Sequence, residues 1–218
     1  MNKIDALVAA YNEEKTIANV INVLSETPLI NRIIVVDDGS SDKTFSVVSK
    51  LASPRVILLK MKTNSGKSQA IATGLIKVTT KNVFLWDADL IKLTPKICEA
   101  IIRPVLNGHA NMSIGMRNYG VTPPVISKYF HSISGERAIN TDILKKCTKS
   151  KYFYNYGMET VINYYCIINH LKTAKKVFNY GHINHLSKDG SLLGFFIYLK
   201  QTFLILKIYL IFFIKGWH

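Results

Sequence analysis

The sequence predicts an α/β fold in which a mostly parallel sheet is flanked by helices. Short apolar runs alternate with stretches whose apolar residues recur at helical spacing. The alternation repeats about every 25 residues, as in chains that connect parallel strands through helices. At 218 residues, the chain is also long enough to bury a substantial core.

The expected elements follow one another along the chain. Strands are expected at residues 4–10, 33–36, 56–59, 83–86 and 174–179. Helices are expected at residues 17–24, 44–51, 64–76, 95–106 and 161–168. Polar residues follow the first, second and fourth strands, and in a parallel, Rossmann-like sheet such loops meet at one edge. The sequence therefore predicts that one cleft holds all three loops.

Asp87 and Asp89 come directly after the apolar run 83–86. A buried strand that ends in Asp-x-Asp leaves two carboxylates at the edge where α/β folds bind ligands. Two hard oxygen donors suit a divalent cation that carries a diphosphate. A strand-end turn with two solvated acids is the alternative.

Residues 66–68 (G-K-S) invite a P-loop interpretation. The P-loop pattern requires glycine at position 61, and the residue there is Met61. A G-x-G-x-x-G fingerprint is absent after the first strand, which argues against a nicotinamide or flavin enzyme. Lys67, at a helix start, can still contact a phosphate, and a solvated surface lysine is the alternative.

Charge is distributed unevenly along the chain. It carries 28 Lys and Arg against 14 Asp and Glu, a formal net charge of +14. Residues 111–218 hold 14 of the basic residues and only 4 of the acidic ones. This suits an anionic partner such as a phosphorylated substrate, a lipid headgroup or nucleic acid. The sequence shows no helix-turn-helix, zinc-finger or RNP pattern, so a nucleic-acid partner is not expected.

Three cysteines, Cys98, Cys147 and Cys166, are widely spaced and form no C-x-x-C pair. They indicate reduced thiols rather than a disulfide framework or a zinc site. The first five residues show no apolar signal-peptide region. A cytoplasmic location is therefore expected.

Four short motifs follow one another in the first half of the chain. They are 8–14 (V-A-A-Y-N-E-E), 35–44 (V-V-D-D-G-S-S-D-K-T), 64–67 (N-S-G-K) and 87–89 (D-A-D). In order and spacing they resemble the motifs of the GT-A glycosyltransferases of family 2. This resemblance implies a GT-A fold, a UDP- or GDP-sugar donor and a divalent metal ion, Mn²⁺ or Mg²⁺.

The resemblance also implies roles for the donor-side residues. Ala10, Tyr11 and Glu13 would form the site for the base and ribose. Asp38 would accept a hydrogen bond from the ring N–H of the base, and Lys67 would contact the diphosphate.

For the metal ion, the resemblance implies Asp89 as a ligand, with Asp87 reaching the ribose, or the metal through water. His182 and His185 follow the strand expected at 174–179. His185 better matches the histidine that completes the metal site in glucosyl-3-phosphoglycerate synthases. Partly exposed histidines near a turn are the alternative. A cation that bridges both phosphates would assist departure of the nucleoside diphosphate.

The second half contains residues 134–138 (S-G-E-R-A), which are similar to the S-G-x-R-A segment of polyprenyl-phosphate sugar transferases. The resemblance places Ser134, Gly135 and Arg137 near the acceptor.

Residues 157–159 (G-M-E) resemble a G-x-E segment of the same enzymes and of glucosyl-3-phosphoglycerate synthases. Glu159 would then touch the donor sugar or serve as catalytic base. An acid at a helix start can equally be a partner of the helix dipole, which is the alternative. Arg117 is a candidate contact for the sugar or phosphate.

Residues 192–214 are almost all apolar or aromatic. As one helix they would be about 34 Å long, enough to span a bilayer. Lys200 and Lys207 lie one heptad apart on one face, and each would cost about 2.5–3.5 kcal/mol inside a span. The pattern favours a helix in the membrane interface, with a core helix or a dimer contact as alternatives. The expected organisation is a GT-A domain at 1–190 and a membrane-associating tail at 191–218.

These features predict metal-dependent transfer of a hexose from a nucleotide-sugar to a polyprenyl or dolichyl phosphate at the cytoplasmic face of a membrane. The alternative keeps the donor but uses a small soluble acceptor such as 3-phosphoglycerate. A basic nucleic-acid-binding protein is a further alternative. So is a nucleotidyltransferase, although the first strand lacks its glycine-rich phosphate loop.

Overall fold

The computed structural model describes residues 2–117, 134–154, 157–178 and 181–182. The strands are β1 (Ile4–Ala10), β2 (Ile30–Asp37), β3 (Val56–Lys60), β4 (Asn82–Asp87), β5 (Leu90–Ile91), β6 (Met112–Arg117), β7 (Arg137–Asn140), β8 (Thr173–Phe178) and β9 (Gly181–His182). The helices are α1 (Ile17–Glu26), α2 (Thr44–Leu51), α3 (Lys67–Leu75), α4 (Pro95–Leu106), α6 (Thr141–Cys147) and α7 (Gly157–Ile168).

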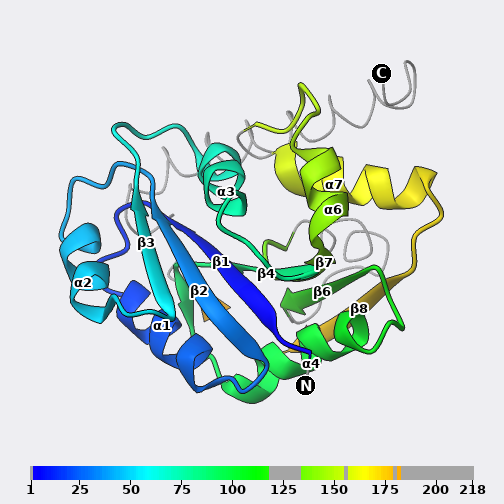
Figure 1. Ribbon diagram of the computed structural model, residues 1–218, viewed down its shortest axis with the longest axis horizontal. Coiled ribbons are helices and arrows are strands. Elements are labelled where there is room, and N and C mark those ends of the chain that lie inside the picture. Colours follow the sequence, from blue (N-terminus) through cyan, green and yellow to red (C-terminus); the bar gives the residue numbers. More distant parts are fainter. Residues whose placement is uncertain (1, 118–133, 155–156, 179–180, 183–218) are drawn as a thin grey trace.

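Seven strands form one sheet in the order β3-β2-β1-β4-β7-β6-β8. Neighbouring strands are parallel except where β7 pairs with β4 and with β6. The sheet is therefore mixed but mostly parallel, which confirms the predicted class (Figure 1). β7 is absent from the predicted strands because it is only four residues long and leads directly into α6.

The predicted boundaries hold closely in the first half of the chain. β1, α2 and α4 have the predicted bounds, whereas β2 begins at Ile30 rather than at residue 33. Asn31 and Arg32 interrupt the apolar run of β2, which hid the true start of the strand. Both side chains donate hydrogen bonds to Asp5 of the neighbouring strand.

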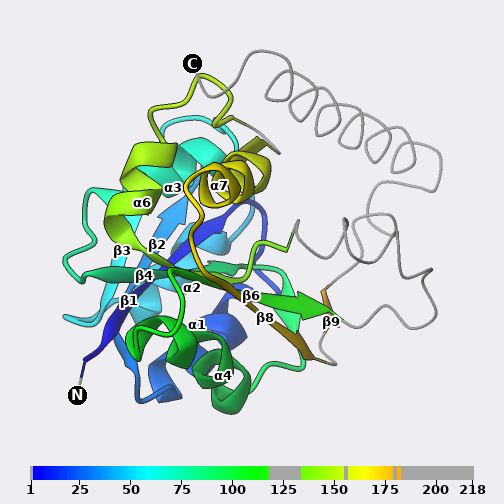
Figure 2. The same cartoon turned by 90° about the vertical axis from the view of Figure 1, so that its right-hand side faces the viewer.

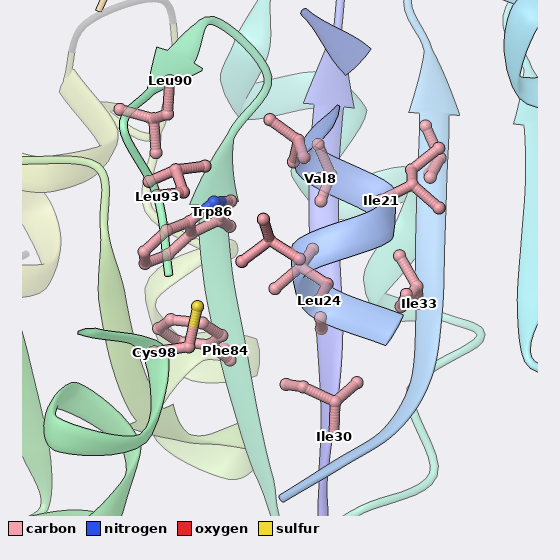
Figure 3. Packing of buried hydrophobic residues seen from close by; sticks show 14 of the residues in the cluster. Val8, Ile21, Leu24, Ile30, Ile33, Phe84, Trp86, Leu90, Leu93 and Cys98 are labelled. Carbon is pink, nitrogen blue, oxygen red and sulfur yellow. The ribbon is translucent and has the colours of Figure 1, made fainter. Parts of the chain in front are cut away.

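Helices cover both faces of the sheet (Figures 1 and 2). α1, α2 and α4 lie on one face, and α3, α6 and α7 lie on the other. In β4, Phe84 and Trp86 pack on the face covered by α1, α2 and α4, whereas Val83 and Leu85 pack on the face covered by α3, α6 and α7. Figure 3 shows Phe84 and Trp86 beside residues of α1 and β1. Because the middle of β4 is buried on both faces, residues 83–86 are all apolar instead of alternating.

Asp5 is a buried carboxylate near the amino end of β1. It accepts hydrogen bonds from Arg32 Nη2 at 2.8 Å, from Asn31 Nδ2 at 2.9 Å and from the backbone N–H of Thr79 at 2.9 Å. Burial would raise the pKa of Asp5, but these donors outweigh it and hold the pKa below its ordinary value. The carboxylate is therefore charged at neutral pH and ties β1 to β2 and to the segment before β4.

Asp5→Asn should lower the free energy of unfolding by about 2–4 kcal/mol at pH 7, because it leaves the Arg32 guanidinium without its counter-charge. The native pKa of Asp5 lies below the unfolded value. Its contribution is therefore complete above about pH 4 and is lost as the pH falls through the native pKa. Urea unfolding at several pH values measures this difference. Equal stability of the two proteins at pH 7 would contradict the prediction.

All three cysteines are free, as predicted, and all three are buried. Burial raises the pKa of Cys98 and Cys147 to about 12, and that of Cys166 to about 11. The reactive thiolate form is therefore scarce at neutral pH.

Within the described ranges, no helix has the length and apolar character needed to cross a membrane. The tail predicted at 191–218 lies outside those ranges.

Candidate active site

The carboxyl ends of β1, β2 and β4 lie side by side. In the parallel ladders, Ala9 pairs with Asp87 and the buried Ala10 pairs with Asp37. β2 and β4 flank β1 on opposite sides, so the direction of strand succession reverses here, where open α/β sheets bind ligands. The three loops predicted to share one edge therefore do so.

Asn12 joins the first of these loops to the second. Its backbone adopts a left-handed φ of 56°, which asparagine tolerates better than most residues. Its side-chain oxygen accepts a hydrogen bond from the N–H of Ser41 at 2.9 Å. The N–H of the buried Glu13 donates to Thr44 Oγ1 at 2.7 Å. These hydrogen bonds hold the backbone that follows Tyr11, whose side chain is 43% exposed.

Asp38 holds the loop that precedes α3. Its Oδ1 accepts from the N–H of Ser65 at 2.9 Å, and its Oδ2 accepts from the N–H of Gly66 at 2.8 Å. The close approach of the two loops requires Gly39, where φ is +71° and a Cβ would lie 2.7 Å from the carbonyl carbon of Thr63. Asp38 thus determines where α3 begins, and its contact with a nucleotide base stays a prediction.

Lys67, at the start of α3, lies between two carboxylates. Its Nζ is 2.7 Å from Asp87 Oδ1 at the end of β4 and 3.0 Å from Glu159 Oε1 in the first turn of α7. The side chains of Lys67 and Asp87 are 34% and 18% exposed, and that of Glu159 is buried. Burial would lower the pKa of Lys67, but the charges of Asp87 and Glu159 outweigh it and raise the pKa. The amino group is therefore a fixed positive charge.

Gly135 packs directly against this ion pair. A Cβ on Gly135 would lie 2.4 and 2.5 Å from the two carboxylate oxygens of Asp87, and 2.5 Å from Lys67 Nζ. Because β7 runs antiparallel to β4, the residues just before β7 reach the edge where β4 ends. The segment predicted to lie on the acceptor side therefore touches the centre formed by Lys67 and Asp87.

Gly135→Ala should reduce transferase activity at least about tenfold while costing only about 1–2 kcal/mol of stability. The added methyl group would push apart the ends of two side chains, which can move, rather than backbone atoms. Steady-state transfer assays and thermal unfolding measure the two effects.

Gly108→Ala is the matched control, since Gly108 has a φ of +73° and no atom within 4 Å of a Cβ built there. It should lose stability without a matching loss of activity. Full activity of the Gly135→Ala protein would show that the contact with the ion pair is unimportant.

Arg137, the first residue of β7, is completely buried. Its Nε donates to the carbonyl oxygen of Ser134 at 3.2 Å, and its Nη1 donates to Asn163 Oδ1 at 3.1 Å. The Ser134 hydroxyl donates to the buried carboxylate of Glu136. Arg117 ends β6, and its side chain lies outside the described part of the protein.

The Asp-x-Asp turn lies close to the segment that carries the predicted histidines. Asp89 is half-buried between β4 and β5, and Leu90 of β5 pairs with His182 of β9. Carboxylate and imidazole groups are donors that fit Mn²⁺ or Mg²⁺. The described residues form no group of three or more His, Cys, Asp or Glu suited to a metal ion, and His185 lies outside them.

Two further residues of the site are missing from the sequence-based predictions. Asn163 lies four residues after Glu159 on the same face of α7, and this spacing could have indicated it. Asp37 accepts from the N–H of Ser40 through Oδ1, but its buried Oδ2 has no hydrogen-bond partner among the described residues. Buried oxygens without a hydrogen-bond partner are rare in folded proteins, and this one lies beside the loops that follow β1 and β2.

Solved structures with this arrangement of strands and helices include glucosyl-3-phosphoglycerate synthase from Mycobacterium tuberculosis. Its complex with phosphoglyceric acid matches with a TM-score of 0.70 and 22% identity, over 84% of this chain and 72% of that chain. Its complex with Mn²⁺, UDP-glucose and phosphoglyceric acid matches with a TM-score of 0.69, the same identity and the same coverage. The fold is therefore of the GT-A type.

The chain belongs to glycosyl transferase family 2, whose sequence profile matches residues 5–166. The UDP-N-acetylglucosamine–dolichyl-phosphate N-acetylglucosaminyltransferase of Methanococcus voltae is 32% identical over 128 residues, covering 51% of this chain and 50% of that protein. The dolichyl-phosphate beta-glucosyltransferase ALG5A of Trichomonas vaginalis is 36% identical over 94 residues, covering 38% of this chain and 29% of that protein. The chain thus spans half or less of these two relatives, and the family resemblance is confirmed.

Proposed function

We propose that the protein transfers a hexose from a UDP- or GDP-sugar to a polyprenyl or dolichyl phosphate. The observation that carries this proposal is the position of Lys67 between Asp87 and Glu159. A protonated amino group at a helix start, beside the loops of β1 and β2, is well placed to meet a diphosphate.

The donor binds across the loops that follow β1 and β2. Ala10, Tyr11 and Glu13 surround the base and ribose, and Asp38 accepts from the base. The hydrogen bonds of Asn12 and Asp38 to neighbouring backbone hold both loops in place before the donor arrives, which supports this assignment.

Asp89 would hold Mn²⁺ or Mg²⁺, with Asp87 and His185 contributing. When bound there, the ion would supply positive charge that favours departure of the nucleoside diphosphate. Lys67 adds a second positive charge at the same place, and its two carboxylate partners keep the amino group protonated and oriented. Arg117 contacts the sugar or a phosphate.

The acceptor approaches from the side of Ser134 and Gly135. Glu159 orients the donor sugar or serves as base. Two observations support a lipid phosphate acceptor. The second half of the chain is basic, and the chain is similar to two dolichyl-phosphate glycosyltransferases. The protein acts at the cytoplasmic face of the membrane.

The test is to incubate the full chain and Mn²⁺ with a panel of radiolabelled UDP- and GDP-sugars, adding polyprenyl phosphate or 3-phosphoglycerate. Label in the organic phase supports the lipid acceptor, and label in an anionic water-soluble product supports the alternative. Samples with EDTA test the requirement for a metal ion. Absence of transfer and of donor hydrolysis with every sugar would defeat both assignments.

Deleting residues 191–218 should release the protein from sedimented anionic liposomes, because it removes the Phe, Ile and Leu residues that would enter the acyl-chain region. Sedimentation with anionic and with neutral vesicles measures the effect. Unchanged sedimentation of the shortened chain would contradict the role assigned to the tail.

A further inference from the structure

α7 presents two polar side chains, one helical turn apart, to the centre of the molecule. Glu159 contacts Lys67, and Asn163 accepts a hydrogen bond from Arg137 through Oδ1 at 3.1 Å. Both residues are buried, and residues four apart share one face of a helix. One rigid element therefore supports both the Lys67 amino group and the Arg137 guanidinium.

Arg137 transmits this support to the main chain. Its Nε and Nη2 both donate to the carbonyl oxygen of Ser134, while Nη1 is held by Asn163. Ser134 is bonded to Gly135, whose Cα lies so close to Asp87 and Lys67 that a methyl group would not fit. The guanidinium thus holds the main chain at Ser134, the residue next to Gly135, which packs against Asp87 and Lys67.

Burial keeps the Arg137 side chain away from any bound substrate. Its side chain has no exposed surface, so it cannot touch a substrate unless the residues around it move. Burial lowers the pKa of Arg137, and the charges of Glu159, Glu136 and Asp87 act in the opposite direction. A buried cation in this position needs well-directed hydrogen bonds, and Asn163 supplies one of them.

We propose that Asn163 and Arg137 are positioning residues that hold the Ser134–Gly135 main chain against the Lys67–Asp87 pair. They act through the main chain rather than by contact with the acceptor. The inference rests on the proposed function, which assigns sugar transfer to the sheet edge formed by the carboxyl ends of β1, β2 and β4.

Asn163→Leu is the informative variant, since it keeps the approximate volume but removes the oxygen that accepts from Arg137. Asn163→Asp keeps an acceptor at the same place. Asn169→Leu is the matched control. Asn169 is exposed just after the end of α7, and its side-chain amide donates to the carbonyl oxygen of Tyr165 on the same helix.

Two readouts are needed, on the full chain with Mn²⁺. In transfer assays, Asn163→Leu should lower kcat about tenfold to a hundredfold with less than about a twofold change in the KM of the nucleotide-sugar. Asn163→Asp should restore kcat to within about threefold, and Asn169→Leu should match the wild type. In hydrogen exchange, the peptide that contains Gly135 should exchange faster in Asn163→Leu, while peptides from β1 to β3 stay unchanged.

Equal impairment of the Leu and Asp variants, or a uniform rise in exchange over the whole chain, would overturn the proposal, since either indicates loss of fold. Unchanged exchange at Gly135 in Asn163→Leu would also overturn it. The exchange experiment needs no donor or acceptor. Failure to find any transfer reaction therefore counts against the proposed function, while the exchange result decides the positioning role by itself.

Discussion

Lys67→Met should reduce sugar transfer by roughly 10²- to 10³-fold, the largest loss expected from a single side chain in this site. The change removes the positive charge that lies 2.7 Å from Asp87 and 3.0 Å from Glu159. It also removes the cation that contacts both carboxylates directly, so thermal stability should fall as well. Steady-state kinetics with the donor identified by the panel, together with thermal unfolding, measure both effects.

Two further variants separate loss of function from loss of fold. Lys67→Arg retains a cation and should recover much of the stability, but its planar guanidinium should recover less of the rate. Lys77→Met is the control, because Lys77 is an exposed residue shortly after the end of α3. Donor turnover within twofold of wild type in a folded Lys67→Met protein would rule out a role for this amino group.

Asp89→Asn should weaken the dependence on Mn²⁺ and lower transfer by about 10²-fold, because an amide is a poorer ligand than a carboxylate for a hard cation. The variant should bind UDP or GDP without metal as the wild type does, and should gain much less affinity when Mn²⁺ is added. Calorimetric titration of the nucleotide, with and without Mn²⁺, separates these contributions.

Asp142→Asn serves as the control for this experiment, since Asp142 is an exposed carboxylate in the first turn of α6. It should leave the Mn²⁺ response unchanged. If Asp89→Asn gained as much nucleotide affinity from Mn²⁺ as the wild type, Asp89 could not be the principal metal ligand.

The first half of the fold could be predicted because each of its strands is a separate local pattern. In β4, residues 83–86 are apolar and stop abruptly at Asp87, so both the strand and its functional end are visible in the sequence. The same is true of β1, where Asn12 and Glu13 follow directly after the strand. Parallel order then brings these ends together without any knowledge of side-chain contacts.

The second half could not be predicted in the same way, because its contacts depend on tertiary packing. Lys67 and Glu159 are 92 positions apart, and they meet only because Met158, Val161 and Ile162 bury α7 on the same face as α3. The sequence suggested a role for Glu159 by resemblance, but it contained no sign of a partnership with Lys67. β7 was hidden for a related reason, since its antiparallel direction follows from pairing with β4 and β6.

β1 carries the Asp5 network near one end and the loop of Tyr11 and Asn12 at the other. Asp5 and Ala10 are five residue steps apart along the strand, which corresponds to about 17 Å. Thermostability and turnover therefore depend on different, distant groups of side chains, which matters for directed evolution. A library confined to the contacts of Asp5 can be selected for heat resistance with little danger to activity, and the stability gained would then tolerate costly changes around Lys67.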